Sequence, residues 1–146
     1  MTTIFEELRA DHDKQRTLLD LLTKTEGDSE GRRELFQQVK DALHHHETAE
    51  ERHFYSPLME YDTGVDKSRH GIAEHHEMDE LMELMDSTDL SSSAWLGYAK
   101  KLQDMALHHF EDEENHYFIS AGQKFSDSEK TTLATRYREE MERLDK

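Results

Sequence analysis

The stretches HHETAEERHFYS at residues 45–56 and HHFEDEENHYFI at residues 108–119 decide the fold of this chain. Each stretch places a histidine four residues ahead of a glutamate, and the two pairs are His46 with Glu50 and His109 with Glu113. Residues four apart lie on one face of an α-helix, about one turn from each other. Each stretch therefore predicts a helix that presents an imidazole and a carboxylate side by side in one direction.

The two stretches belong to a longer internal repeat. Their histidine–glutamate pairs are separated by 63 residues, and the same separation relates Asp11-His12 to Glu74-His75. Apolar pairs follow both of these histidines at the same distance, Leu18-Leu19 in the first copy and Leu81-Met82 in the second. We interpret the repeat as one helical hairpin used twice, with a histidine on its first helix and a His-x-x-x-Glu motif on its second.

The spacing of apolar residues predicts an all-α fold. Apolar positions recur at steps of three and four in four long segments, and polar turns at residues 24–31 and 86–93 separate the two helices of each hairpin. Short turns make neighbouring helices antiparallel, which predicts an up-down four-helix bundle with a pseudo-twofold hairpin duplication. We expect a single domain over residues 1–146, with the bundle at about 3–119. A short C-terminal helix at about 127–144 should pack across the outside or the end of the bundle.

Local signals give the expected helix boundaries. Thr3 and Glu6 form a capping-box pattern that opens the first helix, and Ser126 with Glu129 repeats the pattern before the last one. The second helix is expected from near residue 32 to the late fifties, where Pro57 should kink or end it. The third is expected at about 68–85.

Composition excludes several classes of protein. The chain has 146 residues, a net charge of −16 and no cysteine. The negative charge opposes a phosphate backbone, so nucleic acid is not an expected partner. Disulfides, thiolate zinc sites and iron–sulfur clusters need cysteine and are excluded. The N-terminus lacks the apolar segment of a signal peptide, and no apolar run could span a membrane, so we expect a cytoplasmic protein without a membrane partner.

Six polar residues fall on the stripes that should face the core. They are four histidines and two glutamates from four helices: His12, His46, Glu50, His75, His109 and Glu113. Burying such groups without partners is costly, so either mutual histidine–glutamate hydrogen bonds or metal must compensate. The repeated spacing favours metal. Imidazole and carboxylate without sulfur suit iron, manganese or zinc, and six ligands exceed the needs of one tetrahedral zinc. We predict two metal ions bridged by the two glutamates, with positions left for hydroxide, oxo, dioxygen or peroxide.

The same pattern resembles the hemerythrin-like HHE cation-binding domains over about residues 1–120. Glu51 and Glu114 complete two H-x-x-x-E-E motifs. The resemblance implies a non-haem di-iron centre with two oxo- or hydroxo-bridged iron ions, terminal ligands from the four histidines and bridging carboxylates from Glu50 and Glu113. Oxygen-carrying hemerythrins use five histidines, two of them four apart on the third helix, whereas here the residue four after His75 is Asp79 and the residue four before it is Gly71. The resemblance therefore implies a near-symmetric site and argues against reversible oxygen carriage.

Several nearby residues have open roles. His53 and His116 should lie on the inward side, three residues beyond each glutamate, as partners of the ligands or as extra ligands. Glu51 and Glu114 are alternative ligands if the helix phase differs slightly. Asp79, four residues after His75, has no assigned role.

Three functions remain open. The first is a di-iron protein that binds or reacts with dioxygen, peroxide or nitric oxide, which includes catalase-like peroxide disproportionation. The second is a non-catalytic iron or oxygen sensor, or an iron-buffering module. The third is a helical interaction module with incidental histidines. The sequence indicates no protein partner.

Overall fold

The computed structural model describes residues 2–146, which are almost entirely helical, and no β-strand occurs among them. In chain order the elements are α1 (Ile4–Thr23), α2 (Glu30–Glu50), the π-helical turn η1 (Glu51–Tyr55), α3 (Ser56–Leu58), the 3-10 turn η2 (Asp62–Gly64), α4 (Val65–Asp86), α5 (Ser93–Asp112), the π-helical turn η3 (Glu113–Tyr117), α6 (Phe118–Lys124) and α7 (Asp127–Leu144).

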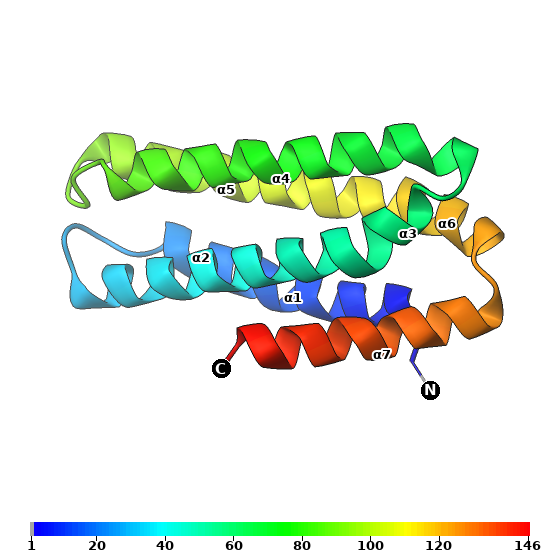
Figure 1. The fold of residues 1–146 in the computed structure, drawn as a ribbon. Helices are drawn as coiled ribbons and strands as arrows, with labels where there is room; N and C mark the ends of the chain where they lie inside the picture. The colour runs from blue at the N-terminus through cyan, green and yellow to red at the C-terminus, as the bar shows by residue number, and fades with distance from the viewer. Residues whose placement is uncertain (1) are drawn as a thin grey trace.

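Two helical hairpins form the body of the molecule. Figure 1 shows α1 with α2 as one hairpin and α4 with α5 as the second, lying against it. The chain continues from α2 through η1 into α3, and from α5 through η3 into α6. The predicted all-α bundle is confirmed. Its fourth helical rod runs to Lys124, beyond the expected end at 119.

Capping side chains begin the first and last helices as expected. The hydroxyl of Thr3 accepts the backbone N–H of Glu6, and the Glu6 carboxylate accepts the backbone N–H of Thr3. Ser126 and Glu129 form the same reciprocal pair at the start of α7. Such caps satisfy backbone donors that have no partner inside the helix.

The two π-helical turns begin directly after the two His-x-x-x-Glu motifs. η1 follows Glu50, and η3 starts at Glu113 itself. A π turn fits one extra residue into the helix and so rotates the residues that follow. The buried side chains after the glutamates are therefore aromatic: Phe54, Tyr55, Tyr117 and Phe118. Pro57 lies just beyond η1 in α3, which ends at the next residue as the sequence predicted.

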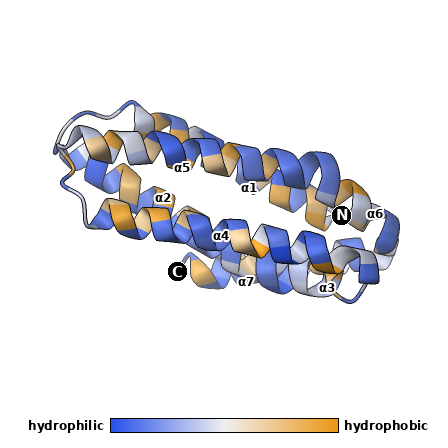
Figure 2. Ribbon diagram, turned by 90° about the horizontal axis from the view of Figure 1, so that it is seen from above, coloured by the Kyte–Doolittle hydropathy of each residue, from blue (hydrophilic) through white to orange (hydrophobic). Residues whose placement is uncertain are grey.

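A buried polar layer divides the core in two. Figure 2 shows hydrophobic residues recurring among hydrophilic ones along the helices. On α1, Leu8 belongs to one hydrophobic cluster and Leu19 to the other, with His12 between them. On α2, Leu43 and Ala49 flank His46 in the same way. The candidate ligands thus occupy one level of the bundle, with apolar packing above and below.

The last helix, α7, runs beside α1 and α2, on the side away from α4 and α5 (Figure 1). Arg138 ties it to α1, with Nη2 at 2.6 Å and Nε at 3.0 Å from the same carboxylate oxygen of Glu7. Tyr137 is completely buried and Met141 nearly so. The expected position outside the bundle is confirmed, but α7 also sends Tyr137 into the polar layer.

Candidate metal centre

All six sequence-predicted ligands meet in the centre of the bundle. Each of the four long helices contributes one histidine, and η3 and the end of α2 contribute the glutamates. Every one of the six residues is at most 1% exposed: His12, His46, Glu50, His75, His109 and Glu113.

Each glutamate faces one histidine from its own helical rod and at least one from another helix, and Glu50 Oε1 also lies 3.9 Å from His109 Nε2. Glu50 Oε2 lies 3.6 Å from His46 Nε2, one turn earlier on α2, and Glu50 Oε1 lies 3.0 Å from His75 Nε2 on α4. Glu113 Oε2 lies 3.4 Å from His109 Nε2, and its Oε1 lies 3.0 Å from His12 Nε2. The i, i+4 spacing thus produces the within-helix pairs, and the packing of the hairpins adds the others.

The ligand atoms divide into two overlapping groups. One contains His12 and His46, the other contains His75 and His109, and both include Glu50 and Glu113. Within each group the ligand atoms lie within 4.8 Å of one another. The two carboxylates are common to both groups. The arrangement therefore suits two cations, each next to one pair of histidines, with the carboxylates between them.

The outer nitrogen of every ring is engaged, so the inner nitrogen is free for a cation. Nδ1 of three histidines contacts a carboxylate: His12 with Glu114 at 2.7 Å, His75 with Glu51 at 2.8 Å and His109 with Glu74 at 2.8 Å. Nδ1 of His46 contacts the hydroxyl of Tyr137 at 2.6 Å. We assign the proton to Nδ1 in each ring, because carboxylates only accept. That tautomer leaves the Nε2 lone pairs directed inward.

The inner atoms are short of partners. None of the four Nε2 atoms makes a hydrogen bond, and neither does any of three glutamate oxygens, Oε1 and Oε2 of Glu50 and Oε1 of Glu113. Orphaned buried polar atoms of this number are rare in proteins. Inward imidazole lone pairs around two carboxylates are the donor set that a pair of divalent cations requires, so the residues fit a metal centre.

Before a cation binds, the two glutamates favour the protonated form of the neighbouring His46 and His109 rings. Burial alone would lower the pKa of His46, but the charge of Glu50 and the carboxylate of Asp11 outweigh burial and raise the pKa to about 10. Burial also opposes the charge on His109, yet Glu113 raises its pKa well above the ordinary value. Burial would raise the pKa of Glu50, but the charge of His46 holds it well below its usual range. A bound cation must displace imidazole protons, so metal uptake should release protons.

Comparison with known proteins agrees with this geometry. The sequence pattern of a family described as the hemerythrin HHE cation binding domain matches residues 3–119. This chain belongs to the hemerythrin HHE family. A similar solved structure is a hemerythrin HHE cation-binding domain-containing protein from Mycobacterium kansasii, with a TM-score of 0.88 and 20% identity over 99% of this chain and 88% of that one. At this identity the likeness shows the fold. No curated protein sequence matches the chain.

In this HHE domain, the residues flanking the ligands act differently from some expectations. Glu51 and Glu114, expected as alternative ligands, hold the outer nitrogens of His75 and His12. The predicted inward placement of His116 is wrong, because the side chain is exposed. His53 is half-buried, with Nε2 at 3.4 Å from Glu140 on α7, away from the cluster. The π turns explain both differences, since they bring the aromatic residues inward instead.

Two tyrosines at this HHE centre were missed from the sequence. The Tyr137 hydroxyl, from α7, donates to Asp11 and accepts from His46 Nδ1. No spacing rule connects α7 to the repeat, so the contact of Tyr137 with His46 could not be predicted from the sequence pattern. The hydroxyl of Tyr55 donates to Oε2 of Glu113.

Gly71 makes room for Tyr55. A β-carbon at position 71 would overlap the phenol ring and hydroxyl of Tyr55. Position 71 precedes His75 by one helical turn and is one of the two positions, with Asp79, where a second histidine on this helix would complete the spacing of the oxygen carriers. In this HHE domain that space is filled by Tyr55, whose hydroxyl donates to Glu113.

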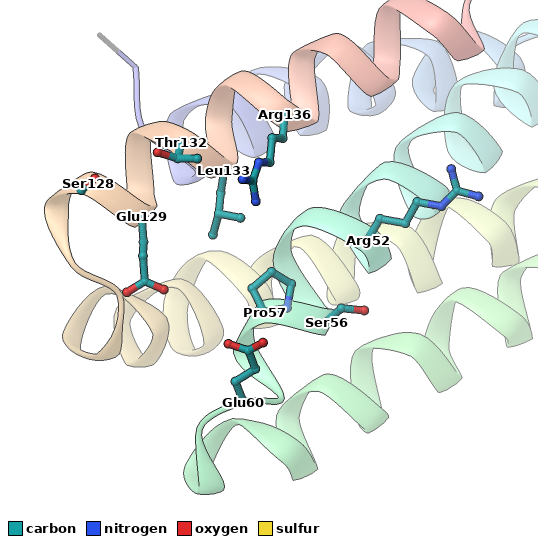
Figure 3. A pocket seen from close by; sticks show the side chains of 9 residues that line it. All are labelled: Arg52, Ser56, Pro57, Glu60, Ser128, Glu129, Thr132, Leu133 and Arg136. Atoms are coloured by element: carbon teal, nitrogen blue, oxygen red, sulfur yellow. The ribbon is translucent and has the colours of Figure 1, made fainter.

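A surface cleft of the HHE domain is separate from the candidate metal centre. It has a volume of about 470 Å³ and lies between α3 and α7. Figure 3 shows its lining, with Arg52 and Arg136 among polar side chains, and none of the six candidate ligands belongs to it. None of the helices in residues 2–146 has the length and apolar character needed to cross a bilayer.

Proposed function

We propose that this chain is a non-haem di-iron protein that binds or reacts with a small oxidant: dioxygen, peroxide or nitric oxide. The observation that carries the proposal is the set of four imidazoles whose outer nitrogens are all engaged and whose inner nitrogens face two shared carboxylates. Metal-binding histidines commonly have their second nitrogen held in this way, because the partner fixes the ring and its tautomer.

The residues divide naturally between two ions. His12 and His46 would hold one, His75 and His109 the other, and Glu50 and Glu113 would bridge them. Two histidines and two shared carboxylate oxygens leave each ion below the six ligands that iron commonly takes, so small molecules have positions to bind. A pair of iron ions would supply two-electron redox chemistry at this place.

The protein's own groups would orient the ligands and limit access. Three carboxylates and one phenol hold the imidazole rings, and hydrophobic clusters lie on both sides of the polar layer. Tyr55 holds a proton on its hydroxyl, directed at Oε2 of Glu113. Burial and the charge of Glu113 raise the pKa of Tyr55 well above its ordinary value, so the phenol keeps that proton at neutral pH.

Catalase-like peroxide disproportionation is a second candidate. Conversion of two hydrogen peroxide molecules into two water molecules and one dioxygen needs a two-electron centre and groups that move protons. The Tyr55 hydroxyl beside a shared carboxylate supports such a role, because a buried proton-bearing group lies next to the ligand cluster. The near-symmetric ligand set, without a fifth histidine, supports reactivity over reversible oxygen carriage.

The test is anaerobic loading with ferrous iron, followed by a metal count and optical spectra after exposure to air and then to peroxide. We expect about two irons per chain and near-ultraviolet bands typical of a bridged di-ferric centre. Gas evolution from peroxide would select the disproportionation, whereas a slow spectral change without turnover would select a sensor or iron buffer. One metal or fewer per chain, without a spectral change, would rule out the di-iron assignment.

A further inference from the structure

A second group of metal-ligand side chains lies outside the six-residue cluster. His44 and Glu47 come from α2 and Asp79 from the facing helix α4, and their ligand atoms lie within 4.8 Å of one another. His44 Nδ1 is 3.3 Å from Asp79 Oδ1 and 3.9 Å from Glu47 Oε2. The group therefore offers one imidazole and two carboxylates to a common point.

Glu47 is buried without a partner. Its side chain is only 5% exposed, and its Oε1 accepts no hydrogen bond from the protein. Burial and the adjacent carboxyl of Asp79 raise the pKa of Glu47 well above its usual range, so without a cation the two carboxyls share a proton. Oδ1 of Asp79 is also buried and unpartnered, although the Asp79 side chain as a whole is 33% exposed. Two neighbouring carboxylates with orphaned oxygens cost free energy unless a positive charge compensates. A half-exposed histidine supplies that charge only when protonated.

The repeat shows that the bundle does not need carboxylates here. The positions that correspond to Glu47 and Asp79 in the other half are Phe110 and Arg16. There the guanidinium of Arg16 lies over the Phe110 ring at 5.5 Å and pairs with Glu114 at 2.9 Å. An aromatic ring and a cation fill the equivalent place, so the repeat does not require carboxylates at Glu47 and Asp79.

We propose that His44, Glu47 and Asp79 form a third divalent-cation site, at the surface of the bundle and separate from the buried pair. One imidazole with two carboxylates suits Mn²⁺, Fe²⁺ or Zn²⁺. The partial exposure of His44 and Asp79 lets water complete the coordination and lets the ion exchange with solvent. Glu47 precedes Glu51, which holds His75, by one turn of the helical rod, so the surface ion would lie close to the buried centre.

The test loads the protein with ferrous iron, removes weakly held iron with a chelator, and then counts bound Mn²⁺ from the loss of the electron paramagnetic resonance signal of the free ion. The variants are His44→Ala and Asp79→Asn, which leave the six buried residues unchanged. We expect wild-type protein to bind one Mn²⁺ per chain more than either variant, or to bind it at least about tenfold more tightly. The readout is the difference in Mn²⁺ binding between wild type and the variants. This difference tests the third site whichever metal fills the buried centre, and it does not depend on the proposed function.

The matched control is His76→Ala. His76 and Glu80 form an exposed pair on α4, with Nε2 and Oε1 2.9 Å apart, that lacks a buried carboxylate. This variant should bind Mn²⁺ as wild type does. Equal Mn²⁺ binding by wild type, His44→Ala and Asp79→Asn would overturn the site and leave Glu47 as a carboxyl group that is simply protonated. An unchanged helical circular dichroism spectrum confirms that each variant is folded.

Discussion

Asp11 and Glu74 occupy equivalent positions in the two hairpins, but only Glu74 lies within hydrogen-bond distance of a histidine of the candidate metal centre. Glu74 Oε1 lies 2.8 Å from His109 Nδ1, whereas Asp11 Oδ2 lies 3.8 Å from His46 Nδ1. Aspartate is one methylene shorter than glutamate, and the hydroxyl of Tyr137 fills the difference by bonding to both Asp11 and His46. The near-symmetric centre is thus made asymmetric by a residue outside the repeat.

We expect Tyr137→Phe to weaken the His12–His46 position selectively. The change removes the hydrogen-bond partner of the His46 N–H, and loss of such an outer partner costs about 10–100-fold in metal affinity. Chelator competition with Co²⁺ should show that one of the two ions is bound more weakly than in wild type. Tyr98→Phe, on a partly buried tyrosine at the other hydrophobic cluster, is the control.

A rescue distinguishes this role from simple packing. In the double variant Asp11→Glu, Tyr137→Phe, the longer carboxylate can reach His46 as Glu74 reaches His109. Affinity should recover at least partly. If both ions weaken equally in Tyr137→Phe, or if the double variant binds no better than the single one, the positioning role of Tyr137 is wrong.

Alanine should lower the stability of the fold at position 71 and raise it at position 97. Gly71→Ala forces a β-carbon against the ring of Tyr55, and such overpacking typically costs about 1–3 kcal/mol. Gly97 lies within α5 with open space around it, so Gly97→Ala should stabilise by up to about 1 kcal/mol through helix propensity. Urea unfolding of the two single variants measures both effects. Comparable stability of the two would show that Tyr55 moves away freely.

The regular parts of the fold and the site could be predicted from the sequence. The stripe of α1 is buried as its spacing indicates, and the i, i+4 pairs of His46 and His109 with their glutamates meet because helical geometry fixes them. Short polar turns likewise determined the hairpins. The buried stripe, the i, i+4 pairs and the turns depend only on residues close together in the sequence, so the helical period predicts them.

The remaining features depend on tertiary packing. The π turns place Phe54 and Tyr55 in the core and leave His116 in solvent, and a pattern read with constant helical period cannot show that rotation. Tyr137 reaches His46 across 91 residues of sequence, from a helix with no counterpart in the repeat. The partners of Tyr137 depend on how α7 packs against the bundle. The few apolar residues of α7 do not determine that packing.

Alkaline pH should destabilise the fold partly through Tyr117. Burial and the nearby charge of Glu74 raise the pKa of Tyr117 from 10.0 to about 12. Between these two values the Tyr117 phenol keeps its proton in the folded state and loses it in the unfolded state. Its contribution to the unfolding free energy is therefore fully present below pH about 10 and is lost as the pH rises toward 12. Between pH about 9 and about 11.5, urea unfolding should show wild type losing more stability than Tyr117→Phe. Parallel losses in the two proteins would contradict the assignment.

Removal of metal should lower stability without unfolding the bundle. Imidazolium–carboxylate pairs such as His46 with Glu50 hold the cluster together without a cation, so helical circular dichroism should persist after chelation. Reloading should raise the unfolding free energy by about 2.7 kcal/mol when free metal exceeds its dissociation constant a hundredfold. Glu50→Gln removes a shared ligand and should abolish most of that gain, whereas Glu80→Gln, on an exposed carboxylate, should keep it. Identical unfolding midpoints of stripped and reloaded wild type would instead mean that the buried histidines serve only the packing of a helical module.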